Sequence, residues 1–307
     1  MSTTVRASLR RLPAARASWV RPILLANLIG EGLIVVTGGV VRLTGSGLGC
    51  PTWPECVPGS FVPVPHQEQG IHKFIEFGNR TLTGLVGILA LLSIWAVVTH
   101  WPRRRPMHWV AYGVLAGVVA QAVLGGITVR TGLNPFSVAG HFLLSMVLVA
   151  LSTALVRGAE DTESGPGDLL VHPLARLLAL ATAAMGTVVL VLGTVVTGSG
   201  PHSGDAVTPA RTGFDPRFVS WMHADAVMFF CGLVIASLVA VRLTAKDGRA
   251  NRAWNVVLLV TVLQGVIGYV QYFTALPEVL VLAHMFGATA LVVALAYGVL
   301  DLRSNPV

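Results

Sequence analysis

The chain contains one stretch twice, and this repeat decides the fold. Residues 121–141 read QAVLGGITVRTGLNPFSVAGH and residues 264–284 read QGVIGYVQYFTALPEVLVLAH, so a Gln and a His are 20 residues apart in both. The tetrapeptide Thr-Gly-Ser-Gly also occurs twice, at residues 44–47 and 197–200. Similarity of this kind within one chain indicates two copies of one structural unit. We therefore expect two halves of similar architecture.

The composition around these stretches is that of a membrane protein. The 307 residues are 54% hydrophobic and only 11% charged, with a mean hydropathy of +0.73. The net charge of +7 comes from Lys and Arg in short segments between apolar runs. Such a chain has no continuous basic surface to follow a phosphate backbone, so nucleic acid is excluded as a partner and the lipid bilayer is expected instead.

Eight apolar runs are long enough to cross a bilayer as helices, which takes about 20 residues each. They cover residues 22–41, 76–99, 109–129, 137–157, 173–196, 217–241, 253–273 and 278–300. Each half holds four runs, an even number, so both halves enter the membrane in the same sense, as a parallel repeat. The predicted fold is an all-α polytopic membrane protein, with eight transmembrane helices in two tandem four-helix bundles.

The positive charges predict the orientation. Fifteen of the 21 Lys and Arg residues fall on one side of the membrane and six on the other, and the richer side is cytoplasmic. We expect a multi-pass protein of the cell membrane with both termini in the cytoplasm. The predicted parts are a cytoplasmic N-terminal segment (1–21), an N-terminal four-helix half (22–157), a cytoplasmic linker (158–172), a C-terminal four-helix half (173–301) and a cytoplasmic tail (302–307).

Two cysteines lie in the first long outer loop, roughly residues 43–75. Cys50 and Cys56 are six residues apart, and in an oxidising compartment such a pair closes a small disulfide. The alternative is a pair of unpaired thiols in a turn-rich loop. The second outer loop, roughly residues 198–216, has no cysteine.

Three histidines within the spans share one depth. His141, His223 and His284 lie about four, six and six residues inside the outer ends of the fourth, sixth and eighth runs. At about 1.5 Å per residue, the three imidazoles fall within one helical turn of each other. Pairs of neutral imidazoles on adjacent helices are suited to heme iron. The alternative is that each histidine only bonds to a neighbouring helix.

The repeat predicts a fourth histidine that the sequence lacks. His223 precedes His284 by 61 residues, and counting back 61 or 62 residues from His141 reaches Arg80 or Asn79. We take Asn79 as the substitute. His223 with His284 is then a complete ligand pair, and His141 with Asn79 an incomplete one.

Glu76 lies three residues before Asn79, near the outer end of the second run. A desolvated carboxylate there can accept a proton during chemistry. The alternative is an interfacial glutamate paired with Arg80 or Lys73. His72, four residues before Glu76, is kept as a reserve ligand.

Taken together, these features resemble the heme A synthase family over about residues 20–300. The match consists of two four-helix repeats, the outer cysteine loop, Glu76 with Arg80, and histidines on the fourth, sixth and eighth spans. The resemblance implies an oxidoreductase that converts the C8 methyl of heme O into the formyl group of heme A, with a water-derived oxygen, for terminal oxidases. It implies heme b as a cofactor at His223 and His284, and heme O as the substrate at His141. It also implies an essential Glu76 and a structural or redox-active disulfide between Cys50 and Cys56.

The chain departs from the family pattern at two places. Asn79 stands where the family has histidine, and the second outer loop lacks the cysteine pair of many members. We expect His141 to hold the substrate iron alone, with Asn79 offering a hydrogen bond to water or another axial group. The heme-farnesylating enzyme and oxidase assembly factors are the protein partners that the resemblance suggests.

Two other classes of protein fit parts of the pattern. A diheme membrane electron carrier linked to quinol would also need histidines at one depth, although the absent fourth histidine argues against two six-coordinate hemes. A transporter would also show a parallel repeat, but it would bind no heme.

Overall fold

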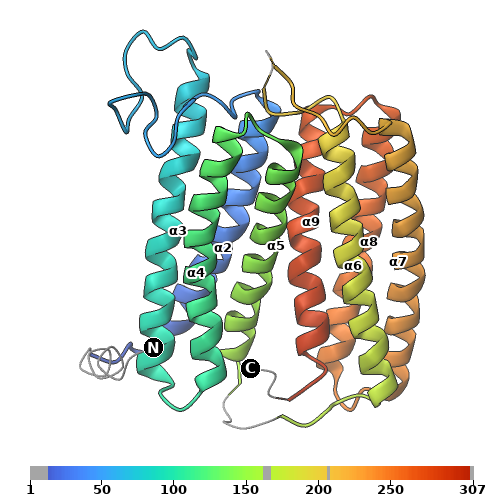
Figure 1. The fold of residues 1–307 in the computed structure, drawn as a ribbon. Coiled ribbons are helices and arrows are strands. Elements are labelled where there is room, and N and C mark those ends of the chain that lie inside the picture. The colour runs from blue at the N-terminus through green and yellow to red at the C-terminus, as the bar shows by residue number, and fades with distance from the viewer. Residues whose placement is uncertain (1–12, 162–166, 206–207, 305–307) are drawn as a thin grey trace.

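The computed structural model describes residues 13–161, 167–205 and 208–304, and this part of the chain contains eight long helices (Figure 1). The helices are α2 (Ala17–Leu43), α3 (His72–His100), α4 (Arg105–Arg130), α5 (Pro135–Gly158), α6 (Pro173–Ser199), α7 (Pro216–Thr244), α8 (Gly248–Phe273) and α9 (Glu278–Leu300). All eight are long and apolar enough to cross a membrane. The predicted fold class is confirmed. The predicted N-terminal segment, linker and tail lie partly outside the described residues.

Helix lengths repeat between the two halves. Helices α2 and α6 both have 27 residues, α3 and α7 both have 29, and α4 and α8 both have 26. Helices α5 and α9 have 24 and 23. The sequence repeat therefore corresponds to a structural repeat of four helices.

Each half is a closed ring of four helices. In the first half α2 contacts α3 and α5, and α4 contacts α3 and α5; in the second half α6, α7, α8 and α9 make the equivalent contacts. The rings meet through α5 and α9, which lie side by side in the middle of the molecule (Figure 1). The contact of α2 with α9 recurs as the contact of α6 with α5. This pattern places the axis of the repeat between α5 and α9, along the helices.

Several helices begin outside the apolar runs because local signals start them there. Proline occupies the first turn of α4, α5, α6 and α7, where its missing N–H loses no intrahelical bond. The side chains of Asn134, Asp215 and Asp247 accept hydrogen bonds from the first turns of α5, α7 and α8, as N-caps do. Hydropathy marks only the part of a helix inside the apolar core, so α3, α4 and α8 start four or five residues before the predicted spans.

A buried ion cluster joins the halves at the end where α5 and α9 finish. Arg157 of α5 is completely buried; its Nη1 lies 2.8 Å from Asp161, and its Nε donates to Asp301, the residue after α9. Asp161 and Asp301 are also buried, at 9% and 5% exposure. Removing one partner of such a cluster leaves a charge without compensation in a low-dielectric surround.

Replacing Asp301 with Ala should therefore destabilise the protein by about 3–5 kcal/mol, the range for breaking a buried ion pair. The measurement is thermal unfolding of the purified protein in detergent, followed by intrinsic fluorescence.

The matched control is Arg21→Ala, which breaks the 3.4 Å contact between Arg21 and Glu160, whose side chains are 60% and 34% exposed. Pairs this exposed contribute about 0–1 kcal/mol. Equal destabilisation by the two variants would show that the Arg157 cluster does not join the halves.

Candidate functional site

One cavity of about 1000 Å³ is lined by residues from all eight helices. This volume is at the upper end of the range of about 300–1,000 Å³ for small-molecule and cofactor sites. The lining includes all three predicted histidines and the predicted substitute, namely His141, His223, His284 and Asn79. The structure thus brings together the residues that the sequence analysis grouped as ligands.

These four residues occupy matching positions on their helices. His141 and His284 are the seventh residues of α5 and α9, and Asn79 and His223 are the eighth residues of α3 and α7. Asn79 lines the cavity and Arg80 does not. Asn79, which the sequence analysis took as the substitute, is therefore the structural counterpart of His223.

Each histidine packs against a glycine of the preceding helix. A Cβ added to Gly125, Gly193 or Gly268 would lie 3.4 Å from the Cε1 atom of His141, His223 or His284, respectively. The three glycines are the twenty-first residues of α4, α6 and α8. A Cβ there would already be in van der Waals contact with the ring, so further side-chain atoms directed at the imidazole would crowd it.

A glutamine holds the backbone beneath two of the histidines. Gln121 Nε2 donates to the carbonyl of His141 at 2.9 Å, and Gln264 Nε2 donates to the carbonyl of His284 at 3.0 Å. These are the Gln and His residues whose 20-residue spacing revealed the repeat. The conserved spacing within the chain thus corresponds to one repeated hydrogen bond between the helices of a pair.

The α2–α3 pair carries different residues at the same level. Thr37 is the twenty-first residue of α2 and so occupies the position that glycine has on α4, α6 and α8. Its hydroxyl donates to Asn79 Oδ1 at 2.7 Å. A Thr–Asn hydrogen bond therefore replaces the Gly–His contact in one of four helix pairs.

The arrangement of the imidazoles fits a heme group. The Nδ1 atoms of His141, His223 and His284 are buried and have no hydrogen-bond partner among the described residues. The His223 and His284 rings lie near enough to each other to interact electrostatically. Unpaired buried nitrogens within membrane helices point to a ligand, and neutral imidazole is a common axial ligand of heme iron.

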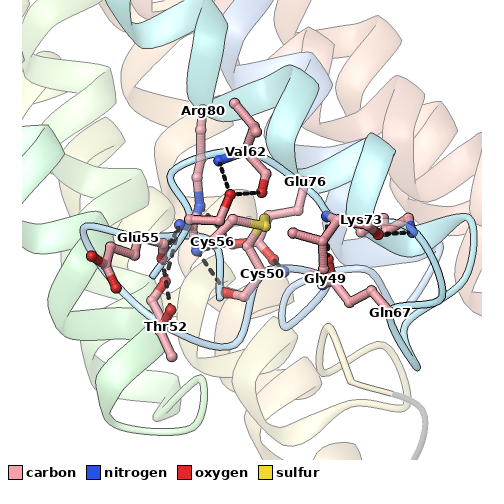
Figure 2. The surroundings of a disulfide bond; sticks show 12 residues. Gly49, Cys50, Thr52, Glu55, Cys56, Val62, Gln67, Lys73, Glu76 and Arg80 are labelled. Atoms are coloured by element: carbon pink, nitrogen blue, oxygen red, sulfur yellow. Dashed lines mark hydrogen bonds and ion pairs between the residues drawn. A yellow bond between two sulfur atoms is a disulfide. The ribbon is translucent and has the colours of Figure 1, made fainter. Parts of the chain in front are cut away.

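Glu76 lies beside the cavity and supports the outer loop. Its Oε1 accepts from Arg80 Nη2 at 2.6 Å, and its Oε2 accepts from the backbone N–H of Cys50 at 2.5 Å (Figure 2). Glu76 is 5% exposed and is not among the residues lining the cavity. The ion pair with Arg80, which the sequence analysis gave as the alternative to a proton-accepting role, is present, while Lys73 bonds to the carbonyl of Val64.

Cys50 and Cys56 form the expected disulfide and are completely buried. Arg80 fastens the loop between them: its guanidinium donates to the carbonyls of Cys50, Thr52 and Glu55 at 2.7, 3.0 and 3.3 Å (Figure 2). The loop is thus attached to α3 one residue after Asn79.

The same loop reaches α4. Trp53 packs so closely on Gly126 that a Cβ there would lie 2.4 Å from the indole ring. Gly125 and Gly126 therefore face His141 and Trp53, respectively. The reserve ligand His72 bonds through Nδ1 to the Ser46 hydroxyl at 2.8 Å and does not line the cavity.

Sequence reasoning missed three residues of the site. Thr37 was missed because hydropathy carries no information on which residue faces Asn79. Glu31 lines the cavity at 2% exposure, and its Oε1 has no hydrogen-bond partner among the described residues; a carboxylate within the first apolar run was the available signal. Arg42 lines the outer end of the cavity and donates to the carbonyls of Thr197 and His202 at 2.8 and 2.6 Å, which joins the two halves.

Fold and site together define a polytopic helical membrane protein with a histidine-lined internal cavity, of the kind that holds heme. The sequence profile of the COX15-CtaA family, described as cytochrome oxidase assembly proteins, matches residues 21–296. The chain belongs to this family.

Curated relatives with similar sequences are named Heme A synthase. The protein from Bacillus licheniformis is 27% identical over 285 residues, covering 86% of this chain and 89% of the relative. The protein from Bacillus mycoides is 24% identical over 290 residues, covering 91% of each chain. The protein from Lysinibacillus sphaericus is 34% identical over 132 residues, covering 41% of this chain and 40% of the relative. The expected resemblance to heme A synthases is confirmed, and with it a heme-related substrate and cofactor.

The contacts of Arg80 predict that Arg80→Leu loosens the disulfide loop. The variant loses three bonds from a charged donor to loop carbonyls, each contributing about 1.5–3 kcal/mol. Reduction of the disulfide by dithiothreitol should accelerate at least about tenfold, measured as the time course of thiol labelling in purified protein.

The control is Arg130→Leu, which removes a single bond, from Arg130 Nη2 to the carbonyl of Trp53 in the same loop. A much smaller acceleration is expected there. If both variants are reduced at the wild-type rate, Arg80 does not hold the loop closed.

Proposed function

We propose that this protein is a heme A synthase, which oxidises the C8 methyl group of heme O to the formyl group of heme A within the membrane. The observation that carries the proposal is the set of three imidazoles and Asn79 at one level around one cavity, in a chain of this family. The methyl carbon is oxidised twice: each step takes up an OH group from water and releases two electrons and two protons, giving an alcohol and then a gem-diol. Loss of one water gives the aldehyde, and an electron acceptor outside the protein takes the four electrons.

The two halves have different tasks in this proposal. In the C-terminal half (173–301), His223 and His284 would hold a permanent heme b, which when bound would supply a path for electrons leaving the substrate. In the N-terminal half (22–157), His141 holds the iron of heme O. We assign the permanent heme to the C-terminal half because that half supplies two imidazoles to the cavity, whereas the N-terminal half supplies one.

Glu76 is our candidate for removing protons from the substrate. It lies at the outer end of α3, three residues from Asn79, which lines the cavity. Its bonds to Arg80 and to the Cys50 N–H orient the carboxylate. The disulfide loop thereby becomes part of the support of the reactive group, because it supplies one of these donors.

The orientation of the protein in the membrane and the identity of its substrate indicate where the reaction takes place and which proteins take part. We place both termini in the cytoplasm of a cell-membrane protein, with the histidine level toward the outer face, from the distribution of Lys and Arg. Heme O is delivered by a heme-farnesylating enzyme, and the product serves a terminal oxidase and its assembly factors.

Replacing His284 with Ala should abolish the heme b spectrum, because one imidazole cannot give the six-coordinate iron that two provide. The measurement is the visible spectrum of purified protein, oxidised and dithionite-reduced. His202→Ala is the control, since His202 does not itself line the cavity; its ring bonds to the carbonyl of Leu276, which does. An unchanged spectrum in His284→Ala would reject this ligand.

Replacing Glu76 with Gln should leave heme b bound and stop formation of heme A, because an amide cannot take up the proton. Extracted pigments are separated by chromatography and compared with those of Glu55→Gln, a control on the disulfide loop that bonds to the Gly59 N–H. A wild-type yield of heme A from Glu76→Gln would discard the role. If Glu76→Gln loses heme A and its disulfide is also reduced as fast as that of Arg80→Leu, Glu76 only supports the loop.

A quinol-linked diheme electron carrier is the second candidate, and the histidines at one level favour it as well. Pigment analysis distinguishes the two. A carrier yields heme B only, whereas the synthase also yields heme O or heme A when the cell supplies heme O.

A further inference from the structure

The four helix pairs share one arrangement of facing residues. Three pairs have the same residue types at these positions, and one pair differs. In each pair the twenty-first residue of the first helix faces the seventh or eighth residue of the second. Three pairs have Gly opposite His, and the α2–α3 pair has Thr37 opposite Asn79. Both members of the contact differ in that pair, which suggests that the two changes belong together.

The spacing explains why they belong together. A Cβ added at each glycine would lie 3.4 Å from the imidazole, already in van der Waals contact with it. Threonine brings that Cβ and, beyond it, a hydroxyl and a methyl group. An imidazole at residue 79 in the orientation of the other three would meet those atoms, whereas the shorter amide of Asn79 fits and bonds to the hydroxyl at 2.7 Å.

We propose that Thr37 and Asn79 together keep one axial position of the heme held by His141 open to an exchangeable small ligand, water in the resting protein. The proposal rests on the proposed function, in which the N-terminal half binds heme O at His141. Thr37 is a positioning residue, because it occupies the amide oxygen of Asn79. The amide N–H groups then remain as donors, so the site suits a small ligand that accepts a hydrogen bond.

The open position gives the two halves different ligand chemistry. Iron held by two imidazoles has no place for a further ligand, while iron held by one imidazole binds an external one. The same feature allows a substrate heme to enter and leave, since only one protein–iron bond has to form and break. A permanent heme in the other half is instead held by two protein–iron bonds.

Carbon monoxide is the probe that reports this difference. The protein is expressed with heme O supplied and purified with its hemes, then reduced with dithionite and titrated with carbon monoxide. We expect the wild type to bind about one carbon monoxide per two hemes, with the heme b spectrum unchanged. The double variant Thr37→Gly/Asn79→His should lose this binding and gain a second six-coordinate low-spin spectrum.

Two further variants test the coupling. The single variant Asn79→His should retain carbon monoxide binding, because Thr37 obstructs the new imidazole ring. If this variant loses carbon monoxide binding as completely as the double variant does, the role of Thr37 is overturned. The double variant Gly193→Thr/His223→Asn places the Thr–Asn pair in the C-terminal half. It should free one axial position of the heme there, so that this heme binds carbon monoxide. The spectrum of the unaltered half in each variant shows that the protein is folded.

Two failures are distinguishable. Two hemes per chain with no carbon monoxide binding in the wild type would overturn the open position and leave the proposed function standing. Absence of heme O and heme A from the extracted pigments, in cells that make heme O, would overturn the proposed function itself, and the open position with it.

Discussion

The close approach of two helices at one level is the contact on which the site depends. A polar side chain inside a membrane bundle needs a partner or a ligand, and three imidazoles here have an unpaired buried nitrogen. They fit inside the bundle because glycine stands opposite each ring.

The same design repeated four times allows the halves to diverge without altering the fold. Helix lengths and ring contacts are nearly identical in the two halves, so the bundle does not depend on which residues face the cavity. Changing one facing pair from Gly–His to Thr–Asn alters the chemistry of one half and leaves its packing intact. A duplicated scaffold can in this way hold one heme permanently and treat another as a substrate.

The two ends of the molecule are joined by different means. At one end, Arg42 of α2 bonds to carbonyls of the second half, and Arg80 attaches the disulfide loop to α3 in the first. At the other end, buried Arg157 bridges α5 to the residue after α9. These polar contacts lie at both ends of the bundle and hold the two rings in alignment along the helices.

The sequence by itself determined the eight spans, the parallel repeat, the disulfide loop and the depth of the histidines, because a bilayer imposes a fixed helix length and an internal repeat marks equivalent positions. It also singled out Asn79, rather than Arg80, as the residue in place of the missing histidine. Only the tertiary structure placed Asn79 in the cavity lining, attached Glu76 to the disulfide loop, and brought Thr37, Glu31 and Arg42 to the site. The reason is physical: depth follows from counting residues along one helix, whereas which side chains face each other depends on how neighbouring helices are rotated, and packing between helices sets that rotation.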